Sequence, residues 1–307
     1  MKHPNWQGII PAILTYFNED YSINFEQTLA HLEFLIENKA DGIIALGTCG
    51  ENNSLEADEK IALLEAIVKQ VNGRIPVIAG VSELTTARAV TYTKNAVAAG
   101  VNGFMVLPAM AYTSCPKETV AHFKAVADAA PKIPLMVYNC PAAYRVDMDI
   151  PILRELAKID NVVAVKEASG DTRRITDVYN EFGDRFLILA GLDDTSFEAI
   201  CLGVKGWISG TVSAFPKEDH AIWTLCQEGR YKEALEIYRW YTPLLHMDAV
   251  PKLVQLIKLI CQEADIKFGN IRCRAPRLDL EGEERAEAVA IIRKAVATRP
   301  DLSKYGL

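Results

Sequence analysis

The sequence predicts an α/β protein folded as a (β/α)8 TIM barrel with a C-terminal helical extension. Eight short, continuously apolar runs recur about every 20–35 residues, and segments with helical periodicity lie between them. Such runs are typical of strands in a parallel sheet that is covered on both faces. Eight alternating units fill a closed barrel. A doubly wound sheet needs fewer strands and usually a GxGxxG turn, which this sequence lacks.

The predicted strands are the apolar runs themselves, and each run has turn residues beside it. In chain order they cover residues 8–17, 42–47, 76–81, 103–108, 135–140, 162–168, 186–191 and 206–211. Prolines at 76, 134 and 216 mark the loops between elements. This spacing leaves room for one helix after each strand.

The segments between the apolar runs are predicted to be helices. Residues 24–38 place their leucines and Ile36 on one face. Residues 54–73 carry Ser54 as the expected N-cap and Gly73 as the expected stop. The same plan of helix and stop recurs at residues 83–100 and 116–130.

The last part of the chain, residues 216–307, is expected to be helical throughout. It supplies the eighth barrel helix and an added helical bundle. We therefore predict a barrel over residues 1–225 and an extension, packed on the barrel, over residues 226–307. The sequence contains no low-complexity tract that would separate these parts, so one compact unit is expected.

Two stretches of the extension are assigned to structure rather than to chemistry. Residues 246–260 are apolar at helical spacing and are expected to pack against the barrel. For His246 and Asp248, at the start of this stretch, a structural role is the preferred interpretation, and a place in the site is the less favoured alternative. The "RAPR" at 274–277 is expected to be a surface loop.

Composition excludes several functional classes. The formal net charge is −7 and no long basic run occurs, which argues against a nucleic-acid-binding protein. No apolar stretch reaches 18 residues, so no membrane span is expected. The first residues lack the long apolar core of a signal peptide. Seven scattered cysteines without paired spacing indicate a reduced, cytoplasmic protein.

A lysine in the middle of a predicted buried strand is the main functional signal. Lys166 follows the apolar run "VVAV" of the sixth strand, near its carboxyl end, where barrel enzymes carry catalytic groups. If it points inward, burial lowers its pKa, and the neutral amine can attack a carbonyl carbon to form a Schiff base. Alternatively, its stem packs while the amine reaches the rim or pairs with an acid.

Two further features lie at strand ends. Tyr138 ends the neighbouring fifth strand at the same height as Lys166, where a phenol can transfer protons, or where it simply packs as a barrel aromatic. The turn "GTCGEN" at 47–52 can aim backbone N–H groups at an anion and adds the hydroxyl of Thr48, or it is a plain tight turn. None of the five histidines lies at a predicted strand end, so no metal is expected. If Lys166 forms a Schiff base, no other cofactor is expected, because the lysine iminium is itself the electron sink.

Four motifs together resemble one enzyme family. "GTCGEN", "VIAGV", "YNCP" and "VKEASGD", in this order and spacing, are similar to the dihydrodipicolinate synthase / N-acetylneuraminate lyase family of lysine aldolases. The resemblance runs from about Gly8 into the C-terminal helices. It implies a barrel enzyme, a homo-oligomer as dimer or tetramer, acting on a small 2-oxo acid or cyclic imine through a Schiff base.

The resemblance also implies roles for individual residues. Lys166 would be the Schiff-base lysine and Tyr138 the proton relay. The substrate-binding residues it implies are Thr48 and Cys49 at the carboxylate, Ile208 and Ser209 along the pocket, and Tyr112 as the counterpart of a relay tyrosine.

Departures from the family pattern bear on the substrate. Cys49 replaces a threonine, and Ala143 stands where dihydrodipicolinate synthases carry an arginine for a distal carboxylate; Arg145 comes two residues later. Stretches such as "GVSELTTARAV", "YNCPAAYR" and "RAPRLDLEGEER" resemble the bacterial 1-pyrroline-4-hydroxy-2-carboxylate deaminases of hydroxyproline degradation. This resemblance implies release of ammonia and 2-oxoglutarate semialdehyde.

Other functions stay open at this point. A 2-keto-3-deoxy sugar acid aldolase or dehydratase would need several polar contacts near the rim, and the sequence offers candidates there, such as Ser169 and Asp193. Dihydrodipicolinate synthase itself is a further alternative. A non-catalytic sensor or regulator would be expected to have lost the lysine or the tyrosine, and both are present.

Overall fold

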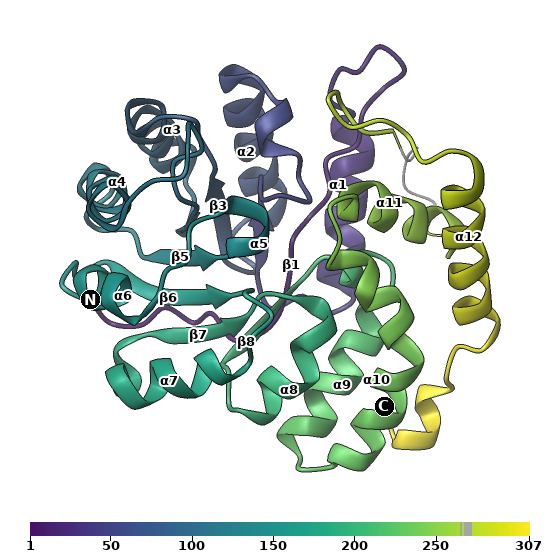
Figure 1. Ribbon diagram of the computed structural model, residues 1–307. Helices are drawn as coiled ribbons and strands as arrows, with labels where there is room; N and C mark the ends of the chain where they lie inside the picture. Colours follow the sequence, from purple (N-terminus) through teal and green to yellow (C-terminus); the bar gives the residue numbers. More distant parts are fainter. Residues whose placement is uncertain (265, 267–271) are drawn as a thin grey trace.

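The computed structural model describes residues 1–264, 266 and 272–307 (Figure 1). Within these residues, eight parallel strands form one sheet in the order β1-β8-β7-β6-β5-β4-β3-β2. A bridge between Ala12 and Ile44 brings β1 beside β2 and closes the ring. The predicted (β/α)8 barrel is therefore confirmed. The strands are β1 Gly8–Pro11, β2 Ile43–Ala45, β3 Val77–Val81, β4 Gly103–Val106, β5 Leu135–Asn139, β6 Val162–Glu167, β7 Leu187–Ala190 and β8 Gly206–Ser209.

The strand register decides which side chains meet inside the barrel. Lys166 pairs with Tyr138 on β5 and with Leu189 on β7, and Leu189 pairs with Gly206 on β8. Paired residues of adjacent parallel strands point to the same face, and side chains alternate along each strand. Ile208, two residues beyond Gly206, therefore shares a face with Lys166.

Helices cover the outside of the barrel after each strand. They are α1 Phe25–Glu37, α2 Ala57–Val71, α3 Thr86–Ala99, α4 Pro116–Ala129, α6 Ile150–Leu156, α7 Arg173–Phe182, α8 Ser196–Cys201 and, after β8, α9 Pro216–Gln227. Each buries apolar side chains, as Leu32 and Leu35 are buried on α1. The short helix α5 Pro141–Tyr144, between β5 and α6, has no buried residue. Apolar periodicity thus places the helices on the barrel.

The start of α2 differs from the prediction. Ser54 is not the N-cap, because it ends a short 3₁₀ turn, Asn52–Ser54. Glu56 precedes the helix instead and forms a reciprocal capping box with Glu59. The helix ends at Val71, next to the predicted stop.

The C-terminal part is mostly helical, but not throughout as expected, because residues 272–281 contain no helix. It contains α9 Pro216–Gln227, α10 Tyr231–Leu245, α11 Leu253–Glu263 and α12 Gly282–Ala297, and Figure 1 shows α12 on the outside of this group. The division predicted at residue 225 falls in the last turn of α9, and it stays a prediction. No helix in the described ranges is both long and apolar enough to cross a membrane.

Candidate active site

Lys166 lies inside the barrel near the end of β6. Its side chain is 6 % exposed, and its Nζ lies 4.0 Å from the centre of the Tyr138 ring. Gly191, just after β7, makes room for it: a Cβ there would come within 2.6 Å of Lys166 Cγ and 2.9 Å of Cε. The Lys166 side chain therefore packs between the Tyr138 ring and the backbone of Gly191.

Substituting Gly191 by alanine should displace the lysine. The added methyl cannot coexist with the present position of the Lys166 stem, and a displacement of about 1 Å at a reacting group can cost about 10²-fold in rate. We expect turnover to fall by about this factor, measured by steady-state kinetics. Gly203→Ala is the control, because it adds a Cβ at positive φ with no neighbouring atom within 4 Å. Equal losses in both variants would contradict the displacement.

The surroundings of Lys166 favour a neutral amine. Burial lowers the pKa of Lys166, while Asp248 and Cys49 nearby oppose the shift. Within the described part of the chain, no hydrogen bond or ion pair engages its Nζ. The amine is thus free to meet a ligand. Glu167, the next residue, faces away and accepts from Asn139 Nδ2 at 2.9 Å.

A second tyrosine, Tyr144, lies beside Tyr138, and no motif singled out in the sequence includes it as a site residue. The short helix α5 brings the Tyr144 ring edge-on to Tyr138, with centroids 5.6 Å apart. Its hydroxyl is 2.5 Å from Thr48 Oγ1, at the end of β2. Burial raises the pKa of Tyr138 and of Tyr144, so both stay neutral phenols that can donate. Three hydroxyl-bearing residues thus cross the barrel mouth from β5 to β2.

The turn after β2 is held by hydrogen bonds and an ion pair from two other parts of the chain, the segment after β1 and helix α11. Thr15 donates to the Gly50 carbonyl at 2.8 Å, and Glu51, at φ 53°, forms a buried ion pair of 2.6 Å with Lys258 of α11. Cys49 in this turn is buried, and burial raises the pKa of its thiol. The turn therefore presents Thr48 and a neutral thiol to the interior.

Asp248 lies near the end of β8 and the turn after β2, which agrees with the less favoured of its two sequence interpretations. It lies in the short turn His246–Asp248, and a Cβ on Gly210 would be 2.7 Å from its Oδ1 and 3.3 Å from Cys49 Sγ. Asp248 is also the first acid to act on the pKa of Lys166. His246 points elsewhere and contacts Asp194 at 2.9 Å. No local pattern in the sequence predicts this, since the residue comes from the helical extension.

Ser209 lies on the opposite face of β8 from Ile208. Its hydroxyl donates to Asp193 Oδ2 at 3.1 Å, and Trp207 Nε1 donates to Asp193 Oδ1 at 2.8 Å. Thr211 donates to the same carboxyl through its N–H and its hydroxyl. Asp193 is fully buried and holds the turn after β8 in place. Contact of Ile208 or Ser209 with a substrate stays a prediction.

Three other residues named from the sequence lie on the outside. Tyr112 is 63 % exposed, and its hydroxyl donates to Glu118 at 2.7 Å. Ala143 and Arg145 are exposed on and after α5, so the α5 turn presents Tyr144 inward instead.

The loop that carries Arg274 is anchored to α2. Two guanidinium nitrogens of Arg274 donate to the two carboxylate oxygens of Glu59, each at 2.6 Å.

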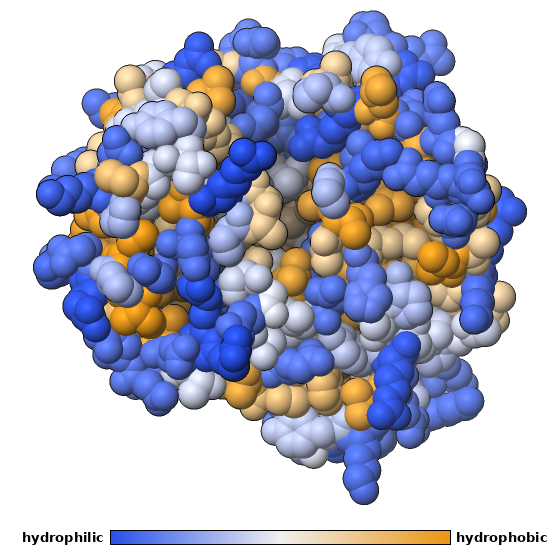
Figure 2. Space-filling view, viewed as in Figure 1, coloured by the Kyte–Doolittle hydropathy of each residue, from blue (hydrophilic) through white to orange (hydrophobic). Residues whose placement is uncertain are grey.

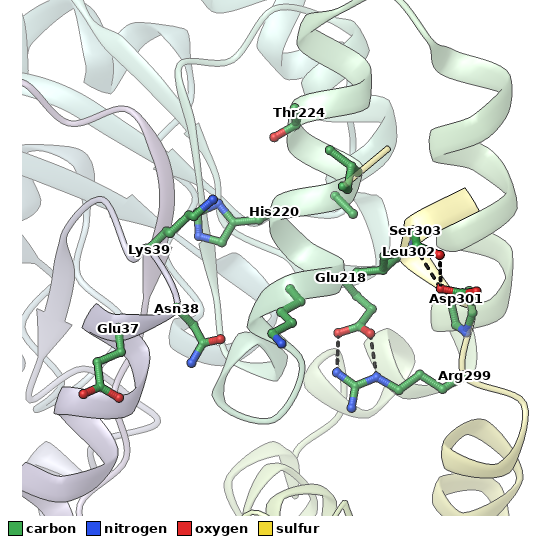
Figure 3. A pocket seen from close by; sticks show the side chains of 14 residues that line it. Glu37, Asn38, Lys39, Glu218, His220, Thr224, Arg299, Asp301, Leu302 and Ser303 are labelled. Atoms are coloured by element: carbon green, nitrogen blue, oxygen red, sulfur yellow. Dashed lines mark hydrogen bonds and ion pairs between the residues drawn. The ribbon is translucent and has the colours of Figure 1, made fainter. Parts of the chain in front are cut away.

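The surface above these groups is hollowed. Figure 2 shows the hollow near the centre of the face, beside α5 as seen in Figure 1. A separate cavity of about 790 Å³ lies between the end of α1, α9 and the C-terminal turn (Figure 3). The Glu218–Arg299 fork occupies one wall of it. This cavity shares no lining residue with the cluster around Lys166.

The fold and this cluster define a class of enzyme. A parallel barrel with a buried amine and a phenol at neighbouring strand ends is suited to chemistry through a lysine Schiff base. The sequence matches the Dihydrodipicolinate synthetase family over residues 5–295. The chain belongs to this family of Schiff-base lysine lyases.

Individual relatives agree with the family assignment. The chain is 31 % identical over 282 residues to a 4-hydroxy-tetrahydrodipicolinate synthase of Oceanobacillus iheyensis, covering 91 % of this chain and 94 % of that one. It is 32 % identical to the enzyme of that name from Methanosarcina mazei, with 94 % and 98 % covered. The solved dihydrodipicolinate synthase of Bacillus anthracis superposes with a TM-score of 0.89 at 28 % identity, covering 96 % and 99 %.

Proposed function

We propose that the protein is a deaminase that converts 1-pyrroline-4-hydroxy-2-carboxylate into 2-oxoglutarate semialdehyde and ammonia. The observation that carries this proposal is the α5 turn, which brings the hydroxyl of Tyr144 to Thr48 and leaves Arg145 outside. A substrate with a second, distal carboxylate would need a cation at that place. The proposed cyclic imine carries a single carboxylate, so a neutral phenol there suits it.

The first step would form the covalent bond to the protein. The neutral amine of Lys166 attacks C2 of the imine, the C2–N bond of the ring breaks, and the ring opens to a free amine at C5. The turn with Thr48 and Cys49 would hold the carboxylate. The resulting iminium withdraws electrons from C3 and makes its protons acidic.

The next steps would move protons at carbon. Tyr138, 4.0 Å from Nζ measured to its ring centre, is placed to shuttle the C3 proton through Tyr144 and Thr48. The C4 hydroxyl then leaves as water. The C5 amine tautomerises to an imine, and hydrolysis of both imines releases ammonia, the semialdehyde and free Lys166. One water is consumed overall, and no cofactor is required.

Ammonia release from 1-pyrroline-4-hydroxy-2-carboxylate tests the proposal directly. We expect the wild type to release ammonia and Lys166→Ala to release none beyond the spontaneous rate. If the wild type releases no ammonia, the proposed substrate is wrong. The second candidate is the condensation of pyruvate with an aldehyde, favoured by the names of the relatives, and the same preparation would then be assayed for it.

Tyr144→Phe should slow turnover without preventing attachment of the substrate. The substitution keeps the ring against Tyr138 but removes the hydroxyl that contacts Thr48. We expect kcat to fall about 10²-fold, the low end for loss of a proton-transferring group, with little change in KM. Tyr179→Phe, which removes a hydroxyl bonded to a backbone carbonyl at 2.7 Å, is the control. A larger loss in Tyr112→Phe than in Tyr144→Phe would assign the relay to Tyr112 instead.

A further inference from the structure

The short turn that carries Asp248 belongs to the C-terminal extension, yet it reaches the mouth of the barrel. The turn packs between α10, α11 and the 3₁₀ turn Asp193–Thr195 that follows β7. Gly210, after β8, leaves the space that Asp248 Oδ1 occupies. Asp248 is half-buried rather than exposed. An acidic side chain at such a place needs a reason beyond packing.

Four groups face Asp248 from the surrounding elements. They are Lys166 from β6, Cys49 from the turn after β2, and Asp193 and Asp194 from the turn after β7. No ion pair joins Asp248 to Lys166 in the described residues, so the carboxyl is not bonded to the amine. Tyr138 and Tyr144 lie on the β5 side, and Asp248 is held by the elements after β7 and β8. A ligand bonded to Lys166 would therefore meet phenols on one side and a carboxyl on the other.

We propose that Asp248 is the catalytic acid that protonates the C4 oxygen of the ligand held on Lys166. This inference rests on the proposed function for the identity of the ligand. Burial and the neighbouring acid Asp193 raise the pKa of Asp248, so its carboxyl holds the proton that it must give. Tyr138 works at C3, and a second group is needed for an oxygen one carbon further along.

Water is eliminated from the enamine form of the ligand. The enamine electron pair moves to form the C3–C4 double bond and restores the iminium at C2. The C4–O bond breaks as the Asp248 proton passes to the oxygen, and water leaves. Asp248 remains as a carboxylate and regains a proton from solvent. In an aldol cleavage the same carboxyl, in its ionised form, would instead accept the proton of the C4 hydroxyl.

Asp248→Asn separates this role from the earlier steps. We expect ammonia release to fall about 10²–10⁴-fold, the range for loss of a general acid. Exchange of the pyruvate methyl protons in D₂O, which needs the Schiff base and proton transfer at carbon but no leaving oxygen, should stay within about threefold of the wild type. The decline of the wild-type rate at high pH, where Asp248 loses its proton, should vanish in the variant. Asp248→Glu should restore part of the rate.

His246→Gln is the matched control, since it changes an exposed residue of the same turn whose imidazole lies 2.9 Å from the Asp194 carboxyl. Its ammonia release should be close to that of the wild type. Unchanged ammonia release in Asp248→Asn, or an equal loss of pyruvate exchange, would overturn the role of Asp248. If the wild type exchanges pyruvate but releases no ammonia, the substrate proposal fails instead. The same variants are then compared in pyruvate–aldehyde condensation, where equal rates would overturn the inference.

Discussion

Lys166→Ala is expected to lose both ammonia release and covalent capture of 2-oxo acids. Borohydride added with pyruvate should attach a reduced adduct to the wild type at Lys166, and mass spectrometry of the intact chain and its peptides should find none in the variant. The turnover loss should reach at least about 10⁴-fold, because the covalent intermediate cannot form. The substitution removes a buried amine that makes no hydrogen bond among the described residues, so the variant should still fold.

The pH dependence of adduct formation gives a second readout of the same lysine. Burial lowers the pKa of Lys166 from its ordinary value. The reactive neutral amine is therefore populated at a lower pH than in an ordinary lysine, and the adduct rate should rise as pH climbs through this lowered pKa. Lys205, in the turn before β8, is the comparison as Lys205→Ala, which should keep the adduct. An adduct that persists in Lys166→Ala would assign the chemistry to another amine.

The barrel could be predicted because its signal is local. Each strand is a short apolar run, and the eight runs contain β1 to β8 as observed. The start of α2 could not be placed, because Ser54 is a good N-cap by residue type while the geometry of the 3₁₀ turn moves the cap to Glu56. The choice between two caps two residues apart changes the free energy of the helix by only about 1 kcal/mol. Packing of the helix against the rest of the fold can outweigh this difference.

The site could be predicted only where its residues lie on strands. Lys166 and Tyr138 stand out because a strand end is recognisable in the sequence, and the register pairs them. Tyr144 reaches Thr48 only through the turn of α5, and Asp248 arrives from a helical extension that no local pattern connects to the barrel mouth. Such residues become visible only when the packing of distant segments is known.

Lys258→Met is expected to destabilise the protein strongly. Lys258 Nζ lies 2.6 Å from Glu51 Oε1 and 2.8 Å from the Arg272 carbonyl, and both side chains of the ion pair are 0 % exposed. Removing Lys258 leaves the buried Glu51 carboxylate with the more distant Arg277, whose Nη1 lies 3.7 Å from Glu51 Oε2. Loss of one partner of a buried ion pair typically costs about 3–5 kcal/mol. Urea unfolding followed by circular dichroism should show this as a lower midpoint. KM should rise as well, because Glu51 ends the turn that carries Thr48.

Two companion variants decide whether the loss comes from the uncompensated charge. Lys252→Met removes an exposed pair with Glu284 beside the same helix and should cost at most about 1 kcal/mol. The double variant Glu51→Gln, Lys258→Met removes both charges together and should recover much of the stability lost in Lys258→Met. The recovery should not extend to KM, because the Glu51 carboxylate also accepts the Arg274 N–H at 3.0 Å and ties the turn to the C-terminal segment. A double variant as unstable as the single one would mean that Lys258 stabilises the fold by packing, not by charge. In that case its contacts over the Phe17 ring, 4.8 Å away, would be the place to look.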